Sequence, residues 1–291
     1  METEIDFTVC PHVPGRAYNG ANGKKVAIRF EDDVWMLKFP PNVREKPTGL
    51  SYSNSCYSEH IASSIFRMLG IPAQETRLGM HANGSVKIVC ACRDFTTDGR
   101  VLLDFCSIKN TIIDSETNGT GTELQEILDT IELQQFVDPV LLKDFFWDMF
   151  VADALLGNFD RHNGNWGFLA NRESGKTEIA PVFDCGSCLL PQADESVMRK
   201  VIEDPAECDA RIKVFPASAI KIRDHKINYV EFIRSGANPD LKAAVDRIVP
   251  RIDIGLFCAF IENLPYLTDL QRKFYCHYLT ARNRALFGDE I

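Results

Sequence analysis

The most regular pattern of hydrophobic and polar positions runs from residue 139 to residue 156. Apolar side chains recur there every three or four positions, which is the spacing of one helix face. Pro139 suits the first turn of a helix, and Gly157 suits the position beyond its end. We therefore predict a buried helix over residues 139–156. Its apolar face consists of Leu142, Phe145, Phe146, Met149, Ala152 and Leu156.

A second pattern has the period of two that a β-strand gives. Two runs rich in strand-forming residues, 25–30 and 34–39, flank a short acidic turn and predict a hairpin. One face of the second run is formed by Trp35, Leu37 and Phe39. Met36 and Lys38 share the other face. Lys38 therefore points into a cleft toward an anionic partner, or is a solvent-facing lysine at the sheet edge.

Residues 57–69 have apolar positions at helical spacing, and Gly70 and Pro72 end the pattern. Glu59 lies near the start of this predicted helix. Kinase-type enzymes orient their phosphate-binding lysine with a glutamate on a neighbouring helix. We therefore expect Lys38 and Glu59 to form an ion pair.

The run 86–95 predicts another strand that leaves into a connecting loop. The backbone near Cys90 and Cys92 is expected to contact an adenine edge, with Phe95 closing the pocket. The alternative is an apolar strand end without a ligand.

The composition becomes helical after residue 122. Besides 139–156, we predict helices over residues 123–136, 229–235, 239–248, 254–264 and 268–287. Residues 185–216 are polar with little periodicity, and we expect a loop there. Residues 109–122 are rich in Thr, Asn and Gly, which indicates a connection between two lobes. The predicted fold class is α+β, with a β-rich N-lobe (1–115) and a helical C-lobe (116–291).

Polar side chains of a catalytic kind follow the predicted helix 139–156. Asp160, His162 and Asn165 lie within six residues, and Asp184 follows a later apolar run. Phosphoryl transfer needs a carboxylate that accepts or orients the hydroxyl proton. It also needs an amide and a second carboxylate to hold magnesium. We predict Asp160 as the base and Asn165 and Asp184 as metal ligands. His162 either braces the loop or takes the proton itself.

A stretch rich in Gly and Asn precedes the predicted hairpin. Glycine has no Cβ, so backbone amides can approach phosphates closely. The same stretch also suits an ordinary turn. We expect the nucleotide to contact Asn19, Gly20, Asn22, Gly23 and Lys24.

The composition is that of an ordinary globular protein, with 291 residues, 45% of them hydrophobic and 25% charged. A formal net charge of −9 argues against a broad surface for nucleic acid or anionic lipid. The chain contains no apolar run that approaches the roughly 18 residues of a membrane span. We expect neither nucleic acid nor membrane as a partner. The first ten residues are acidic, so we expect a cytoplasmic protein. A secretion route that needs no signal peptide stays open.

The ten cysteines are expected to be reduced and mostly buried. Cys90 with Cys92 and Cys185 with Cys188 could bind zinc if the two pairs converged. The spacing of the first pair is unfavourable, and Cys185 would crowd Asp184. We therefore favour free thiols.

Together these motifs resemble the HipA-like serine/threonine kinases. The resemblance spans about residues 15–285. It is carried by residues 19–25, residues 52–70 with Glu59, the Asp-x-His-x-x-Asn loop at 160–165 and the Pro-Val-Phe-Asp sequence that ends at Asp184. The resemblance implies a two-lobed protein-kinase-like fold that uses ATP and Mg²⁺ on a protein Ser or Thr. It implies Lys38 on the phosphates, Asp160 as the base, and Asn165 and Asp184 on the metal.

The chain departs from the longer HipA toxins in two respects. Those proteins have an additional N-terminal subdomain, so the resemblance does not imply a toxin role. They also have a phosphorylatable serine in the glycine-rich loop, whereas residues 15–37 contain no Ser or Thr. Tyr18 carries the one hydroxyl in that stretch.

Three alternatives compete with a protein kinase. Residues 160–165 are also similar to the catalytic loop of phosphatidylinositol kinases, but the chain has no polybasic segment for a membrane surface. A catalytically silent scaffold would predict a broken set of site residues. A purely structural role for residues 160–165 would leave Lys38 and Asp184 unexplained.

Overall fold

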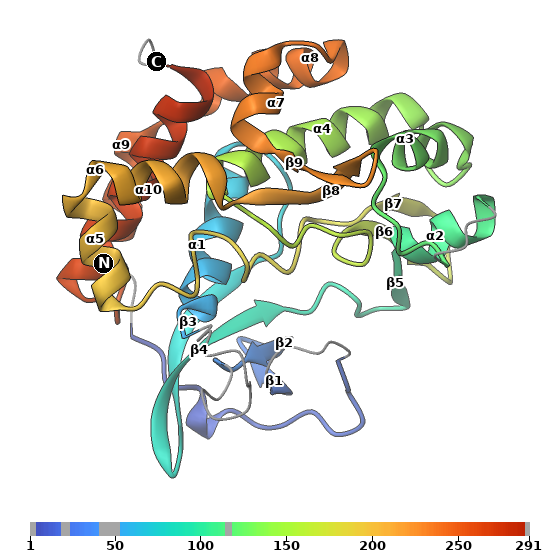
Figure 1. The fold of residues 1–291 in the computed structure, drawn as a ribbon. Helices are drawn as coiled ribbons and strands as arrows, with labels where there is room; N and C mark the ends of the chain where they lie inside the picture. Colours follow the sequence, from blue (N-terminus) through green and yellow to red (C-terminus); the bar gives the residue numbers. More distant parts are fainter. Residues whose placement is uncertain (1–3, 19–23, 41–52, 114–117, 289–291) are drawn as a thin grey trace.

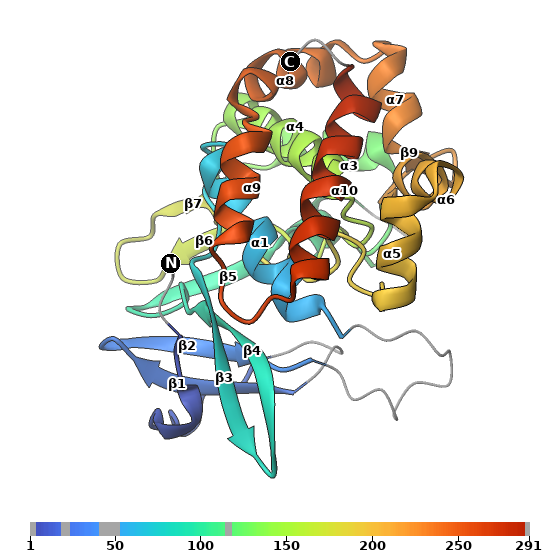
Figure 2. The ribbon, with the colours of Figure 1, turned by 90° about the vertical axis from the view of Figure 1, so that its left-hand side faces the viewer.

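The computed structural model describes residues 4–18, 24–40, 53–113 and 118–288 of the chain. A β-rich part contains the N-terminal strands, and a larger helical part contains the C-terminal half (Figure 1). Figure 2 shows these strands at one end of the molecule and most of the helices at the other. This arrangement confirms the predicted α+β, two-lobed fold class.

A four-stranded antiparallel sheet forms the β-rich part, in the order β1-β2-β4-β3. Its strands are β1 (Lys25–Phe30), β2 (Asp33–Lys38), β3 (Thr76–Asn83) and β4 (Ser85–Arg93). Strands β1 and β2 form the predicted hairpin. Glu31 and Asp32 at its turn have φ of 48° and 65°. Positive φ at both central residues suits two-residue turns that match the twist of the strands.

The two faces of β2 differ as predicted. Trp35 and Leu37 are buried in a small apolar cluster on one face of the sheet. Lys38 lies on the other face, toward helix α1 (Ser55–Met68). The structure therefore favours the cleft for Lys38 over the solvent-exposed sheet edge.

Helix α1 packs into the core of the helical part. Ile61, Ile65 and Phe66 are fully buried in the largest apolar cluster of the protein. Gly70, with φ of +77°, lies just beyond the helix end, as predicted. Glu59 in the second turn is only 1% exposed. A carboxylate buried to that extent requires a cation and hydrogen-bond donors.

The chain leaves the first sheet after β4 and enters a second sheet at β5 (Arg100–Asp104). This sheet has the order β5-β6-β7, with β6 (Gly167–Asn171) and β7 (Thr177–Ile179). Residues 94–99 therefore connect the two sheets. Helices α2 (Phe105–Ile112) and α3 (Leu124–Leu133) follow β5. The lobe boundary near residue 115 stays a prediction.

Helix α4 (Pro139–Leu156) is the buried pillar that the sequence predicts. The Asp138 side chain accepts a hydrogen bond from the Val140 N–H at its start. Gly157 ends the helix with φ of 65°. A Cβ at Gly157 would lie 2.1 Å from the Tyr278 hydroxyl. Glycine is therefore required here by both conformation and space.

The remaining helices mostly match the predicted ranges. They are α5 (Glu195–Glu203), α6 (Pro205–Asp209), α7 (Tyr229–Ser235), α8 (Pro239–Ile248), α9 (Ile254–Glu262) and α10 (Asp269–Phe287). The expected loop over residues 185–216 is wrong from residue 195 onward, where α5 and α6 lie. Asp194 caps α5, while Met198 and Val201 are buried. Two buried positions in so short a helix give little periodicity.

Candidate active site

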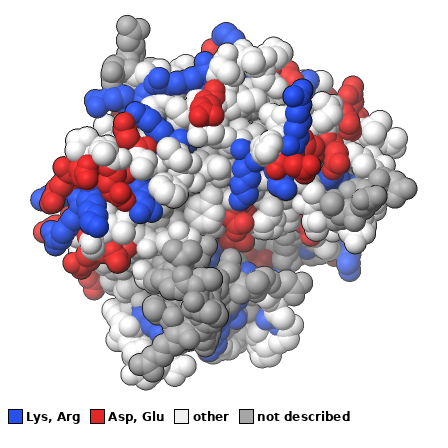
Figure 3. Space-filling model, viewed as in Figure 1, with Lys and Arg blue, Asp and Glu red and all other residues white. Residues whose placement is uncertain are grey.

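A cavity of about 940 Å³ lies between the four-stranded sheet and the helical part. Its volume falls in the range of small-molecule and cofactor sites. The predicted site residues that line it are Lys38, Glu59, Phe95, Asp160, His162, Asn165 and Asp184. Figure 3 shows acidic side chains at the centre of one face of the molecule.

The ammonium group of Lys38 joins two carboxylates. Its Nζ lies 2.8 Å from Glu59 Oε2 and 2.9 Å from Asp184 Oδ1. Burial disfavours the charged form of Lys38, but Asp184 and Glu59 outweigh it and hold the pKa of Lys38 well above its usual value. The expected ion pair of Lys38 with Glu59 is present, and Lys38 is a cation.

Asp184 occupies a restricted backbone position. Its φ of 56° lies in the left-handed region, which residues other than glycine rarely adopt. Lys38 lowers the pKa of Asp184 to about 2. The following amide, Cys185 N, donates to Glu59 Oε1 at 3.1 Å. Glu59 therefore holds Lys38 with one oxygen and the Asp184 segment with the other.

The loop from Asp160 to Asn165 is closed by its own hydrogen bonds. Asn165 Nδ2 donates to the Asp160 carbonyl oxygen at 2.9 Å, which leaves the side-chain oxygen of Asn165 for a cation. The Gly164 N–H donates to His162 Nδ1 at 3.0 Å. This contact supports the bracing role for His162.

Arg161 is a buried clamp that the sequence analysis did not assign. Its Nε donates to Asp153 Oδ2 at 2.9 Å, and its Nη1 donates to the carbonyl oxygens of Asn165 and Phe183. It therefore joins the loop 160–165 to the residue before Asp184. A usable signal was Asp153, a carboxylate within an otherwise apolar stretch of helix, because a buried carboxylate needs a cation.

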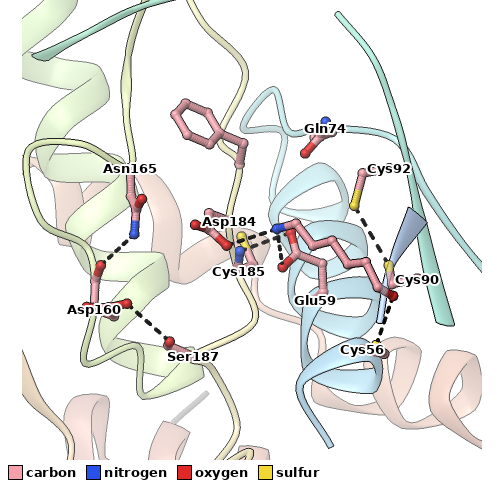
Figure 4. A network of polar contacts seen from close by, with 12 residues as sticks. Cys56, Glu59, Gln74, Cys90, Cys92, Asp160, Asn165, Asp184, Cys185 and Ser187 are labelled. Atoms are coloured by element: carbon pink, nitrogen blue, oxygen red, sulfur yellow. Dashed lines mark hydrogen bonds and ion pairs between the residues drawn. The ribbon is translucent and has the colours of Figure 1, made fainter. Parts of the chain in front are cut away.

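Ser187 is a second site residue that the sequence analysis missed. Its hydroxyl lies 3.5 Å from Asp160 Oδ2, and the residue is 8% exposed. Figure 4 shows the two side chains pointing toward each other. Burial raises the pKa of Asp160 above its ordinary value. Such hydrogen bonds are often long in ligand-free sites and shorten when substrate binds.

The opposite side of the cavity is organised around Asp94. Its Oδ2 accepts from Tyr18 Oη at 2.7 Å and from Arg16 Nε at 2.8 Å. Thr96 donates its N–H to Asp94 Oδ1. The residues just before the glycine-rich stretch are therefore anchored to the connection between the two sheets.

The adenine contact expected at Cys90 and Cys92 does not fit the structure. Both residues lie in β4, which pairs with β2 on one side and β3 on the other. Their backbone groups are therefore used within the sheet. Phe95 lines the cavity as expected, and its ring lies 5.8 Å from that of Phe183.

The residues predicted for phosphate contact in the glycine-rich stretch are only partly described. Asn19, Gly20, Asn22 and Gly23 lie outside the described residues. Lys24 is exposed, and its ammonium group lies 5.6 Å from the centre of the Phe39 ring. The cavity lining includes Lys25 but not Lys24 in the part of the chain that the structure describes.

The zinc alternative is not supported. Cys90 and Cys92 belong to a small cluster beside α1, whereas Cys185 and Cys188 lie in the largest apolar cluster. Among the described residues, no group of three or more His, Cys, Asp or Glu is arranged to hold a metal ion. All ten cysteines are free thiols.

Comparison with known proteins identifies the family. The model of the HipA-like C-terminal domain matches residues 17–250, which is most of the chain. The chain belongs to this family. It is 48% identical over 282 residues to the serine/threonine-protein kinase CtkA of Helicobacter pylori, covering 96% of this chain and 85% of that protein. Because of this similarity, we classify the chain as a serine/threonine-protein kinase.

Two solved structures of the family have the same fold. The crystal structure of the Helicobacter pylori proinflammatory kinase CtkA matches with a TM-score of 0.90 and 45% identity, covering 97% of this chain and 98% of that one. A Shewanella oneidensis HipA, solved with HipB and operator DNA, matches with a TM-score of 0.50 and 16% identity. That match covers 94% of this chain and 67% of HipA, and it supports the fold alone.

No described helix is long and apolar enough to cross a membrane. On the face that Figure 3 shows, basic and acidic side chains are interspersed rather than gathered into one broad basic area.

Proposed function

We propose that this kinase transfers the γ-phosphoryl group of ATP, with Mg²⁺, to a Ser or Thr hydroxyl of a protein. The observation that carries the proposal is the contact of Lys38 with both Glu59 and Asp184, in the cavity that Asp160 and Asn165 also line. A silent scaffold would not need to keep this complete set.

The cavity suits a nucleotide in size and chemistry. Phe95 and Phe183 provide aromatic surface for a base near residues 94–96. We assign the adenine edge to these residues instead of Cys90 and Cys92, because the chain has left the sheet there. Lys38 provides the cation for phosphates.

Asp184 and Asn165 suit magnesium because they offer carboxylate and amide oxygens. Magnesium keeps several water ligands and needs only one or two protein carboxylates, so a larger cluster is not required. Bound Mg²⁺ would neutralise negative charge on the phosphates.

Other residues of the chain orient Lys38 and accept the proton of the substrate. Glu59 keeps Lys38 oriented toward the phosphate oxygens. Asp160 accepts the proton of the substrate hydroxyl at a carboxylate oxygen, and the closed loop that Arg161 clamps fixes its position. His162 is the second candidate for the proton. Its Nδ1 already accepts a hydrogen bond from the Gly164 N–H, so this nitrogen is occupied, which favours Asp160 as the proton acceptor.

Incubation with γ-labelled ATP and Mg²⁺ tests the proposal. Wild type, Asp184→Ala and Asp160→Ala are compared, and a parallel sample of each contains phosphatidylinositol vesicles. We expect label on protein Ser or Thr from the wild type and almost none from either variant. Label on a phosphatidylinositol vesicle alone would instead support the lipid-kinase alternative. Near-normal phosphorylation by Asp184→Ala would contradict the metal assignment.

The same assay reports autophosphorylation, which we propose as an additional activity. A cytoplasmic location is likewise a proposal, and cell fractionation with detection in the medium tests it.

A further inference from the structure

Gln74 connects the two segments that carry the aromatic rings of the cavity. Its backbone N–H donates to the Val182 carbonyl oxygen at 2.8 Å, one residue before Phe183. Its side-chain Nε2 donates to the Arg93 carbonyl oxygen at 2.9 Å, two residues before Phe95. Gln74 is only 6% exposed, and it lines the cavity. A buried polar side chain is therefore held close to the two aromatic residues.

The amide of Gln74 has one end in use and one end open. A carbonyl oxygen can accept only from the nitrogen of the amide, so the contact with Arg93 fixes the orientation of the group. Among the described residues, none donates a hydrogen bond to the side-chain oxygen, Oε1. A buried acceptor normally has a donor, because leaving it unpaired costs free energy. This oxygen can therefore accept a hydrogen bond from a ligand.

The direction of the amide decides which ligand it can contact, because Gln74 also lines a smaller cavity of about 380 Å³. In Figure 4, the oxygen of Gln74 is on the side of Asp184, and the nitrogen is on the opposite side. Asp184 lines the larger cavity and not the smaller one. The open acceptor therefore faces the larger cavity.

Backbone groups near the aromatic rings are already engaged within the protein. The Arg93 carbonyl oxygen accepts from Gln74 Nε2. The N–H groups of Asp94 and Thr96 donate within the protein at 2.9 and 2.8 Å. A side-chain acceptor would therefore supply base recognition that these three groups do not.

We infer that Gln74 accepts a hydrogen bond from the exocyclic amino group of adenine and thereby selects the base of the nucleotide. The amino group of adenine is a donor, whereas guanine has a carbonyl acceptor at the same position. An acceptor whose orientation Arg93 fixes would pair with adenine, but it would meet guanine with two acceptors face to face. The inference rests on the proposed function, because it takes ATP as the ligand.

Calorimetric titration with two nucleotides tests the inference. MgATP is compared with the magnesium complex of purine riboside triphosphate, which has a hydrogen in place of the adenine amino group. We expect wild type to bind this analogue about tenfold more weakly, because one hydrogen bond is missing and a buried acceptor stays unpaired. The phosphates, the ribose and Mg²⁺ are the same in both complexes, so the ratio of affinities reports the base alone.

Gln74→Met removes the acceptor and keeps a side chain of similar length. It should bind the two nucleotides with affinities within about twofold of each other. Two proteins and two nucleotides then form a cycle that isolates the contact between the amide and the amino group. Gln74→Leu serves the same purpose if Gln74→Met does not fold, and thermal melting without ligand reports folding.

Gln134→Met is the matched control. Gln134 is also a buried glutamine whose Nε2 donates to backbone carbonyl oxygens, but it is outside the cavity lining. This variant should keep the wild-type preference for MgATP, because the loss of a buried amide elsewhere does not alter the base contact.

Three outcomes would overturn the inference. These are equal affinity of wild type for the two nucleotides, a wild-type preference that Gln74→Met retains, and loss of the preference in Gln134→Met. The first outcome needs no variant. If wild type bound neither nucleotide, the proposed function itself would fail, and that result is distinct from equal binding of both.

Discussion

Arg161 and Asp153 form an ion pair inside the helical part, with Nε 2.9 Å from Oδ2 and side chains only 2% and 1% exposed. The same guanidinium group donates to the backbone carbonyl oxygens of Asn165 and Phe183, two residues that line the cavity. One buried cation thus connects the geometry of the loop 160–165 to that of the segment at Asp184.

Arg161→Met should destabilise the protein strongly. Removing one partner of a buried ion pair leaves the other charge uncompensated and costs about 3–5 kcal/mol. Urea unfolding measures this cost. The control is Arg199→Met, whose exposed pair with Glu195 should contribute at most about 1 kcal/mol. If the two substitutions lowered the free energy of unfolding equally, Arg161 would not be the buried structural contact proposed here.

Glu59→Gln should reduce turnover while keeping the fold. Glutamine can still accept the Cys185 N–H but loses the charge that pairs with Lys38. The loss of a charge-assisted bond, about 1.5–3 kcal/mol, corresponds to roughly a ten- to hundredfold fall in kcat/KM. Steady-state kinetics measures it. Glu59→Ala removes both contacts and should have a larger effect, and an equal effect would contradict the double role.

Asp184→Asn should change how stability depends on pH. The pKa of Asp184 is lowered from 3.8 to about 2 by Lys38, so the native state favours the carboxylate. The stability from this pairing is fully present above about pH 4 and is lost as pH falls toward 2. The melting temperatures of wild type and Asp184→Asn should therefore differ at neutral pH and converge below pH 4. A constant difference across this range would refute the linkage.

Ser187→Ala should lower kcat through Asp160. The Ser187 hydroxyl lies 3.5 Å from Asp160 Oδ2, so in the proposed mechanism it holds that carboxylate in place for proton transfer. We expect roughly a tenfold loss of kcat with little change in the KM for ATP. Ser196→Ala, at an exposed position of α5, is the control.

A double-mutant cycle separates this role from a general effect of Ser187 on the fold. In an Asp160→Ala background, loss of the Ser187 hydroxyl should have no further effect on the residual rate. Additive losses would mean that Ser187 acts independently of Asp160.

Long, periodic elements could be predicted from the sequence. Helix α4 and the β1–β2 hairpin have enough buried positions to fix their type and their faces. The pairing of Lys38 with Glu59 was predicted from strand alternation together with the lysine–glutamate arrangement of kinase-type enzymes.

Other features depended on partners far away in the sequence. The backbone groups of Cys90 and Cys92 are used within the sheet because β4 is paired on both sides, which a single strand pattern cannot show. Whether Lys24 or Lys25 lines the cavity depends on a register of one residue, which reverses the face that each side chain takes. The role of Arg161 is visible only in the structure, which places Asp153, Asn165 and Phe183 around its guanidinium group.

The packing of α1 has a consequence for motion. Its apolar face lies in the largest core, together with that of α4, whereas β2 packs in a small separate cluster. Glu59 is therefore held by a helix anchored in the helical core, and Lys38 by the sheet, although Cys56 at the start of α1 also packs against β3 and β4. If the sheet tilts away to admit or release a nucleotide, the 2.8 Å contact between these two side chains lies across the opening. The length of that contact thus measures whether the cavity is open or shut.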